Sequence, residues 1–503
     1  MTHILDALGI LCSLSGLLAL VVGTAIGIVV GALPGLGPSI GISLLIPFTY
    51  QMSPEISLLL LISLYMAAEY GGSVSAILLS TPGTAAAAAT TIDGFAMTQK
   101  GQSNKALAIS LSASTVGGLV GGFALLFLAA PLSKLALQFG PSGYFAVGLF
   151  GLTSVAALSG GSLVKGLLGA ALGLLISFIG IDPIAGIPRF AMGHVELFEG
   201  VPMLAALIGL FAVSEALILA ENVGAKPRKS NTGGVRSVRL RLSDWKYLAG
   251  TMASGSVIGT LLGILPGVGG NIACWVARDY AVRRNPKLEF GKGEPKGVAA
   301  PESSNNATVG GAMVPLLSLG VPGSPTTAVI MGALVMHGLR PGPQLFSDQP
   351  VLVYSVLLGL ILTCIVMFVV GSLALPWLAR AVNLPDSVLC VGILVFALLG
   401  AYALRNLTFD IWLTLGFGLV GYAMKKLSFP VAPVVLAMVL GYMVETNFRT
   451  ALVTSQGSYA IFFTDPVSVI FLVLSIFSVC LPVWRSLRTG RRRSSIKLQG
   501  GNP

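Results

Sequence analysis

Long apolar runs follow one another along the whole chain and are separated by short polar segments. Many of these runs reach about 20 residues, the length that an α-helix needs to cross the hydrocarbon core of a bilayer. The first run, within residues 1–30, lacks the basic start and the small-residue cleavage site of a secretory signal, so we expect it to be retained. The pattern predicts an all-α polytopic membrane protein with about 12–15 membrane segments and no sizeable soluble domain.

Glycine and proline interrupt the apolar runs twice in each half of the chain. The segment GALPGLGPSIGIS, residues 31–43, has a counterpart in ILPGVGGNIA, residues 264–273. Likewise STPGT at 80–84 corresponds to GVPGS at 320–324. The first two motifs are offset by 232 residues and the second two by 240. Two ordered motif pairs at nearly constant spacing indicate an internal duplication.

Composition supports a membrane protein, and the charges indicate its topology. Of 503 residues, 54% are hydrophobic and 10% are charged, with a mean hydropathy of +0.89, whereas soluble domains carry about 25% charged residues. The net charge of +11 comes largely from basic residues in 221–246, in 278–296 and in the tail from 485 to 497. Basic loops beside membrane segments mark the cytoplasmic face. The charge therefore predicts contact with a lipid bilayer and no nucleic-acid partner.

The basic loop divides the chain into two halves. We predict a first membrane repeat at 1–220, a basic cytoplasmic linker at 221–246, a second membrane repeat at 247–484 and a basic cytoplasmic tail at 485–503. The turn at 50–55 has no basic residue, whereas its counterpart at 278–296 has six. The halves are therefore expected to be inverted-topology repeats, with Pro/Gly-broken helices or re-entrant hairpins at the interruptions.

The four interruptions imply an interior site. In lipid, unpaired backbone groups cost several kcal/mol each, so broken helices persist only where they face protein or a water-filled cavity. The helix that follows each break begins with free N–H groups and about half a positive charge, which favours anions. The candidate substrate-binding residues are Pro34, Gly35, Gly37, Ser39, Ser80, Thr81, Pro82, Gly83, Thr84, Pro266, Gly267, Gly269, Asn271, Pro322, Gly323, Ser324 and Thr326.

Charge balance predicts a co-transported cation. The four motifs contain no Lys or Arg, and two helix ends supply only about one positive charge. A di- or tricarboxylate would remain under-neutralised in the membrane, so symport with Na⁺ or H⁺ is expected. Na⁺ is placed near the broken helices with no ligand set assigned. The candidate ion-coupling residues are Glu69, Ser73, Ser303, Asn305 and Asn306.

Each of these residues has a second interpretation. Glu69 lies in an apolar run and is a candidate proton carrier, with a structural cap or an ion pair as the alternative. Glu302 and Glu215 are expected near the membrane interface. Asn305 and Asn306 could instead lie in a solvated loop end, and serine and threonine hydroxyls commonly bond back to their own helix.

Four segments together resemble the large membrane subunit of tripartite tricarboxylate transporters. They are LPGLGPSIGISLLIPFTY (33–50), YGGSVSAILLSTPGTAAAAATTIDGF (70–95), ILPGVGGNIACWVARDY (264–280) and the segment 302–343. The resemblance implies the permease of a bacterial inner-membrane system. Such a permease works with a small membrane subunit and a periplasmic solute-binding protein, and an ion gradient drives import of citrate-like carboxylates without ATP.

Other classes of function were weighed against this one. GLGPSIG lacks the continuation of a dinucleotide-binding motif, and the small residues in GGLVGG at 117–122 are typical of helix packing. An integral-membrane lipid-modifying enzyme and an anion channel are the alternatives. Sparse, unpaired acidic residues disfavour an enzyme, and five scattered cysteines disfavour a metal site or disulfides. We expect no enzymatic activity and no cofactor apart from the co-transported ion.

Overall fold

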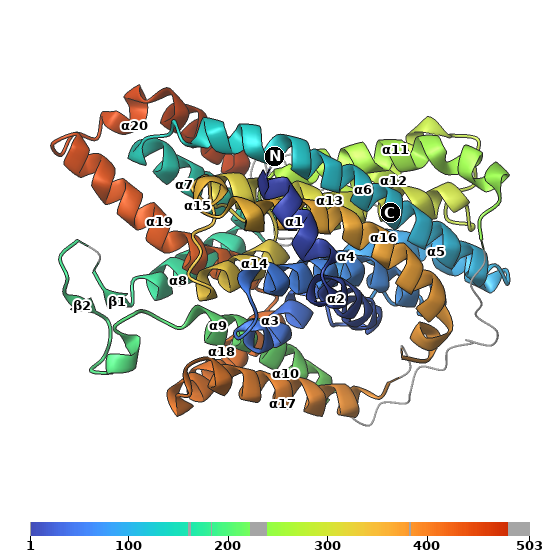
Figure 1. Cartoon of the computed structure of the whole chain (residues 1–503), viewed down its shortest axis with the longest axis horizontal. Helices are drawn as coiled ribbons and strands as arrows, with labels where there is room; N and C mark the ends of the chain where they lie inside the picture. The colour runs from blue at the N-terminus through green and yellow to red at the C-terminus, as the bar shows by residue number, and fades with distance from the viewer. Residues whose placement is uncertain (1, 159–161, 183, 222–238, 382–383, 481–503) are drawn as a thin grey trace, which may run out of the picture. The chain divides into compact units, whose positions relative to one another are not determined.

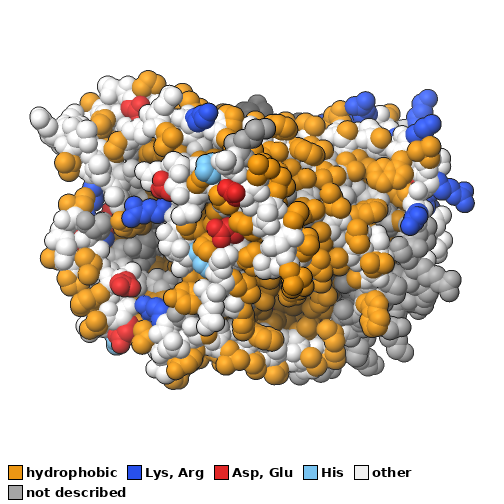
Figure 2. All heavy atoms as spheres, in the orientation of Figure 1, with side chains coloured by type: hydrophobic (Ala, Val, Ile, Leu, Met, Phe, Trp, Pro, Cys, Tyr) orange, Lys and Arg blue, Asp and Glu red, His pale blue; other side chains and the backbone are white. Residues whose placement is uncertain are grey.

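The computed structural model describes residues 2–158, 162–182, 184–221, 239–381 and 384–480. Seven helices among these residues are long and apolar enough to cross a membrane, and six shorter apolar helices accompany them. Apolar side chains gather over the middle of the face shown in Figure 2, as expected for a surface in lipid. The prediction of an all-α polytopic membrane protein is confirmed, since the strands of the described residues are limited to one two-residue pair.

The chain forms two compact units. Unit 1 comprises residues 1–137 and 202–423, and unit 2 comprises residues 138–201 and 424–503. Most of the predicted linker and the whole predicted tail lie outside the described residues, and the helix after the linker begins at Leu242. Each unit takes segments from both predicted halves, and each is described by itself.

Unit 1 contains the four Pro-Gly interruptions and most of the long helices (Figure 1). Its helices are α1 (Thr2–Cys12), α2 (Leu14–Ala32), α3 (Pro38–Thr49), α4 (Pro54–Leu79), the 3₁₀-helix η1 (Ala85–Ala87), α5 (Ala88–Gln99), α6 (Ser103–Ala136), α9 (Met203–Leu207), the π-helix η3 (Ile208–Val213), α10 (Ser214–Glu221), α11 (Leu242–Ile264), α12 (Gly269–Arg284), α13 (Pro295–Leu319), α14 (Pro325–Met336), α15 (Leu345–Asp348), α16 (Pro350–Ala381), α17 (Asp386–Arg405) and most of α18 (Thr408–Lys426).

The predicted duplication is visible in how the long helices of unit 1 pack. Helix α2 packs against α4, and α11 packs against α13, each through three glycines at four-residue spacing. At each glycine, an added Cβ would lie 2.0–2.8 Å from a carbonyl oxygen of the facing helix, so the backbones touch directly. The glycines are Gly23, Gly27 and Gly31 against Leu60, Leu64 and Ala68, and Gly255, Gly259 and Gly263 against Ala300, Ser304 and Thr308. These sets are related by the same offsets, 232 and 240, as the Pro-Gly motifs.

Contacts between the two repeats are reciprocal. Helix α3 of the first repeat packs against α14 of the second, and α12 of the second packs against η1 and α5 of the first. Asn306 Nδ2 donates to the carbonyl oxygen of Met66 at 2.9 Å, and these residues are 240 positions apart. A residue that contacts its own counterpart lies on a two-fold axis. The α4–α13 pair is therefore the centre of a pseudo-two-fold arrangement.

Unit 2 is built around α19. Helix α19 packs against α7 and α8, with Gly173 of α8 pressed against the carbonyl of Val434. Phe145, Phe448 and Phe462 form an aromatic cluster within the unit. Its elements are α7 (Pro141–Leu158), α8 (Leu163–Ser177), β1 (Gly180–Ile181), β2 (Pro188–Arg189), the 3₁₀-helix η2 (Val195–Leu197), α19 (Ala432–Thr454), α20 (Ile461–Thr464) and an apolar helix over Pro466–Cys480.

Four charged side chains join the β1–β2 hairpin of unit 2 to α19. Arg189 donates to Glu445 at 2.7 Å and 3.1 Å, and Arg449 donates to Asp182 at 2.8 Å. Asp182 also accepts the backbone N–H groups of Ala185 and Ile184, each at 2.8 Å. These donors, with Ala185 first and the Arg449 guanidinium next, hold the pKa of Asp182 well below its usual range.

Candidate functional site

Helices of unit 1 end and restart at the four predicted Pro-Gly motifs. We name the motifs the first break (33–37), the second break (80–84), the third break (265–268) and the fourth break (320–324). Gly35 and Gly267 have φ values of +90° and +85°, which glycine adopts without steric cost. Ser80 and Gly320 close α4 and α13 in the left-handed conformation. Broken helices are therefore present in both repeats.

Within each repeat, the two breaks touch. Gly83 of the second break lies so close to α2 that an added Cβ would be 2.0 Å from the carbonyl oxygen of Gly31, just before the first break. In the second repeat, the N–H of Gly267 donates to the carbonyl oxygen of Gly323 at 3.0 Å. In the second repeat, a backbone group freed by one break is thus satisfied by the other.

Between the repeats, the first break contacts the fourth, and the third break contacts the second. Ser39, just after the first break, shares a 2.9 Å hydrogen bond with Thr326, just after the fourth. Gly270, just after the third break, approaches Ala86, just after the second, since an added Cβ would lie 3.3 Å from the Ala86 Cβ. Together with the contacts within the repeats, these contacts link the four breaks in a closed ring.

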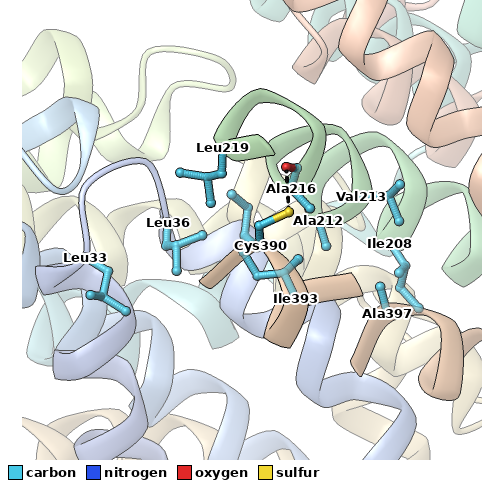
Figure 3. Packing of buried hydrophobic residues seen from close by; sticks show 11 residues of the cluster. Leu33, Leu36, Ile208, Ala212, Val213, Ala216, Leu219, Cys390, Ile393 and Ala397 are labelled. Atoms are coloured by element: carbon cyan, nitrogen blue, oxygen red, sulfur yellow. Dashed lines mark hydrogen bonds between the residues drawn. The ribbon is translucent and has the colours of Figure 1, made fainter. Parts of the chain in front are cut away.

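An apolar cluster holds the first break in position (Figure 3). Leu33 and Leu36 of the break pack with residues of η3 and α10 and with residues of α17. The Cys390 thiol donates to the carbonyl oxygen of Ala216 at 3.3 Å, which joins α17 to α10. The cluster members from these helices are Ile208, Ala212, Val213, Ala216, Leu219, Cys390, Ile393 and Ala397.

The helix N-termini at the breaks differ in how they are capped. Helix α14 is closed by a capping box in which Thr327 N–H donates to Ser324 Oγ at 3.2 Å and Ser324 N–H donates to Thr327 Oγ1 at 2.8 Å. Helix α3 begins after Gly37, η1 after Thr84 and α12 after Val268, and none of them has a side-chain cap. In α3, Pro38 has no N–H and the Ile40 N–H donates to the Gly37 carbonyl oxygen at 3.0 Å. The Ser39 N–H of α3 and the first-turn N–H groups of α12 therefore remain available to an anion.

Glu302 lies inside unit 1, a burial that the sequence analysis did not predict, and its expected position near the membrane interface stays a prediction. Its side chain is 0% exposed in the middle of the helix pair formed by α13 and α6. Thr90 of α5 donates to Oε1 at 2.5 Å, and Ser110 and Ser114 of α6 donate to Oε2 at 2.9 and 3.0 Å. The partners lie about 190–210 positions away along the chain, so only the tertiary fold reveals them.

Several buried polar atoms beside the breaks have no hydrogen-bond partner within the described part of the chain. They include Glu69 Oε2, Thr84 Oγ1 and Asn305 Oδ1. The side chains of Thr84 and Asn305 lie beside the Glu69 carboxyl group, and Asn305 Nδ2 donates to the Glu69 carbonyl oxygen at 3.2 Å. An added Cβ on Gly270 would be 2.7 Å from Asn305 Oδ1, so this polar group adjoins the third break. Buried polar atoms without partners are costly and mark places where a ligand or water binds.

Comparison with known proteins assigns the chain to a family. Residues 17–436 match the model of the tripartite tricarboxylate transporter TctA family. The chain belongs to the TctA family. It is 34% identical over 453 residues to an uncharacterized 52.8 kDa protein in the TAR-I ttuC′ 3′ region of Agrobacterium vitis, which covers 90% of this chain and 89% of that protein. It is also 33% identical over 236 residues to an uncharacterized protein in the TAR-II ttuC′ 3′ region of the same organism, covering 46% of this chain and 97% of that protein. No solved structure matches the chain.

The predicted substrate-site residues of this TctA-family chain all lie in unit 1, on or beside the ring of breaks. Gly35, Ser80 and Asn271 are exposed in the structure. Partly exposed are Pro34, Gly37, Ser39, Thr81, Pro82 and Gly267, and buried are Gly83, Thr84, Pro266, Gly269, Pro322, Gly323, Ser324 and Thr326.

The structure places the predicted ion-coupling residues of the TctA-family chain in different environments. Asn305 and Asn306 are 1% and 0% exposed within α13, so their placement in a solvated loop end is wrong. Ser303 donates to the Ala300 carbonyl at 3.2 Å and occupies the α11 contact at Gly255, which is a packing role. Ser73 instead shares a 2.7 Å hydrogen bond with Ser110, a donor to Glu302.

An ion pair that the sequence analysis did not predict joins the helices after the second and third breaks. Arg278 of α12 donates to Asp93 of α5 at 3.0 Å, and the Asp93 side chain is 0% exposed. Asp93 also accepts backbone N–H groups of Gly291, Gly293 and Glu294. Asp93 lies in DGF (93–95) and Arg278 lies in ARDY (277–280). Neither sequence segment indicates that these two charges pair.

Proposed function

We propose that this chain is the permease subunit of a tripartite secondary transporter that imports di- or tricarboxylates together with Na⁺ or H⁺. Membership of the TctA family supports transport as the activity class. The observation that carries the substrate class is the closed ring of four breaks, with uncapped N-termini at α3 and α12.

The uncapped ends of α3 and α12 are equivalent positions in the two repeats. Each provides backbone N–H donors and about half a positive charge, and neither needs a Lys or Arg side chain to bind a carboxylate. Ser39 and Asn271 lie in the first turns of α3 and α12 and add a hydroxyl and an amide. Two such ends suit a solute with at least two carboxylates, because each end takes one of them.

Coupling to a cation follows from the charges around the ring. A dicarboxylate brings two negative charges against about one positive charge from two helix ends. In the same unit, Glu302 is buried and Glu69 is partly buried. Net negative charge inside a membrane protein is costly, so a co-bound Na⁺ or proton makes substrate binding favourable.

The family name also supports partners and a location. A tripartite system implies two further components, which we propose are a small membrane subunit and a periplasmic solute-binding protein that delivers the substrate. The location would be a bacterial inner membrane, with the chain crossing it many times.

Uptake into proteoliposomes tests the proposal. The full chain is reconstituted with its small subunit and binding protein, and labelled citrate and dicarboxylates are supplied under separately imposed Na⁺ and pH gradients. We expect saturable uptake that one of the gradients drives. Uptake that neither saturates nor responds to a gradient would indicate a channel, and chemical change of an added lipid would indicate an enzyme.

A further inference from the structure

The surroundings of Glu302 consist of hydroxyl groups from three other helices. Thr90 of α5 and Ser110 and Ser114 of α6 donate to its two carboxylate oxygens at 2.5–3.0 Å. Ser73 of α4 also lies beside the carboxylate and is hydrogen bonded to Ser110 at 2.7 Å. We call these five side chains, Glu302, Thr90, Ser73, Ser110 and Ser114, the hydroxyl cage. All five are 0% exposed.

The cage carries a negative charge with no basic side chain paired to it. The ion pairs formed among the described residues do not include Glu302, and the nearby Arg278 is paired with Asp93. The other titratable groups that face Glu302 are Glu69 and Tyr70 of α4 and Cys274 of α12. None of these carries a positive charge. A buried carboxylate needs a compensating charge, because its desolvation is otherwise expensive.

We propose that the hydroxyl cage is a Na⁺ site, and that Na⁺ bound there is the coupling ion of transport. Hard cations take oxygen ligands, and the cage has four hydroxyl oxygens around one carboxylate, three of them within 3.0 Å of a carboxylate oxygen. One carboxylate matches the charge of one monovalent cation. Each hydroxyl can rotate so that a lone pair, rather than its hydrogen, faces the centre.

The number of oxygens in the cage favours Na⁺ over a proton. A proton on Glu302 needs one oxygen partner, which any of the three bonded hydroxyls supplies by accepting, whereas the cage brings together hydroxyls from three helices. Na⁺ makes use of all of them.

The cage is connected to the ring of breaks through two short paths. Asn305 lies three residues after Glu302 on α13, about one helical turn away, and contacts Glu69 and the third break. Cys274 of α12 donates to the Pro301 carbonyl at 3.3 Å and packs with Ala86 and Ala89, which precede Thr90. Ion binding at Glu302 would therefore affect the positions of the helices that follow the second and third breaks. This inference depends on the proposed symport.

Direct Na⁺ binding to the purified full chain tests the proposal independently of transport. Radioactive Na⁺ binding is measured in detergent, with displacement by unlabelled Na⁺ or K⁺. The wild type is expected to bind Na⁺ saturably and to prefer it to K⁺. Glu302→Gln should weaken binding by roughly 100-fold or more, beyond the about 10–100-fold that loss of an outer-shell partner costs at a metal site.

Milder variants keep the test decisive if Glu302→Gln does not fold. Ser114→Ala and Thr90→Val should each weaken Na⁺ binding by about tenfold, and Thr90→Ser should restore it because the hydroxyl returns. Ser318→Ala is the matched control: Ser318 is equally buried on α13, but its hydroxyl bonds to the Val314 carbonyl at 2.7 Å. It should bind Na⁺ like the wild type.

The outcomes separate this inference from the proposed function. If the chain takes up carboxylate but binds no Na⁺, the cage is not the Na⁺ site. The same holds if Na⁺ binding is unaffected in Ser114→Ala and Thr90→Val. In both cases the proposed transport function still stands. Uptake driven by a pH gradient with no Na⁺ stimulation overturns the cage as the Na⁺ site in the same way. Na⁺ binding that depends on the cage in a chain that transports no carboxylate supports the site and overturns the proposed function.

Discussion

Gly83→Ala is the substitution that most directly perturbs the ring of breaks. A Cβ at this position would lie 2.0 Å from the Gly31 carbonyl oxygen, 2.8 Å from Ser75 Oγ and 3.0 Å from the Gly72 Cα. Real Cβ atoms do not approach other atoms more closely than 3.0 Å. The second break would therefore have to move away from α2 by about 1 Å, and the hydrogen bond from Gly83 N–H to Gly72 O would be strained.

The cost of that movement can be estimated from its nearest neighbours. Two of them are backbone atoms, which cannot rotate away, so the substitution acts as overpacking and should cost about 1–3 kcal/mol. Gly323→Ala, the counterpart in the second repeat, meets the Ala312 Cα at 2.8 Å and should cost less. Gly250→Ala is the control, because Gly250 lies in α11 with nothing within 4 Å of the added Cβ. In a helix interior that change should stabilise by about 0.5–1 kcal/mol.

Thermal unfolding of the purified full chain in detergent measures the effect. The expected order of Tm is Gly250→Ala at or above wild type, then Gly323→Ala, then Gly83→Ala. Carboxylate uptake by Gly83→Ala should fall further than its Tm at the assay temperature explains, because the ring itself is displaced. If Gly83→Ala unfolds at the same temperature as Gly250→Ala, the close approach of the two breaks is wrong.

Three further predictions concern the duplication, the buried ion pair and the hairpin of unit 2. Gly27→Val and Gly259→Val place a side chain against the carbonyl oxygens of Leu64 and Ser304, which lie 2.5 and 2.2 Å from the added Cβ. Both should lower the free energy of unfolding by similar amounts, about 1–3 kcal/mol each, and so lower Tm to a similar extent. Strongly unequal losses would contradict the equivalence of the repeats. Arg278→Ala leaves Asp93 buried without its cation and should lower the free energy of unfolding by about 3–5 kcal/mol. Arg278→Lys should have an intermediate effect. A Tm of Arg278→Ala equal to that of the wild type would show that the backbone N–H donors alone stabilise the buried Asp93 carboxylate. The pKa of Asp182 is lowered by the N–H of Ala185 and by Arg449. Its contribution to stability is therefore present above about pH 4 and is lost as the pH falls through the lowered pKa. Protection factors of the 180–189 amides, which are corrected for the intrinsic pH dependence of exchange, should fall on acidification in the wild type and fall less in Asp182→Asn.

The positions of the breaks could be predicted from the sequence because proline and glycine act on the backbone locally. Proline removes an N–H donor and glycine permits positive φ, so Leu-Pro-Gly-x-Gly in an apolar run ends a helix whatever surrounds it. The duplication was likewise detectable, since the motif offsets are properties of the chain. Which breaks touch was not predictable, because the pairings of Ser39 with Thr326 and of Gly270 with Ala86 depend on how the repeats pack.

The burial of Glu302 was not predictable from the sequence, for a specific physical reason. A lone acid in an apolar chain is usually cheapest near the interface, and Glu302 follows the basic stretch 278–296 closely. The hydroxyls that hydrogen bond to the buried Glu302 carboxylate come from α5 and α6. A serine in an apolar run gives no sign in the sequence of which residue it will bond. The run of polar residues ESSNN, unusual within a 25-residue helix, was the available signal.

The duplicated scaffold and the functional side chains obey different rules. Packing positions are preserved between the repeats, because the glycine contacts and the breaks recur at offsets of 232 and 240. The charged positions are not: Ile62 occupies the place of Glu302, and Val309 that of Glu69. Both Ile62 and Val309 are buried, so each repeat could have carried the acid of the other at the same depth. Two symmetric carboxylate sites would double the buried negative charge. If the hydroxyl cage is the Na⁺ site that we propose, a two-fold scaffold with one cage would bind a single cation there for each substrate at the proposed site in the ring.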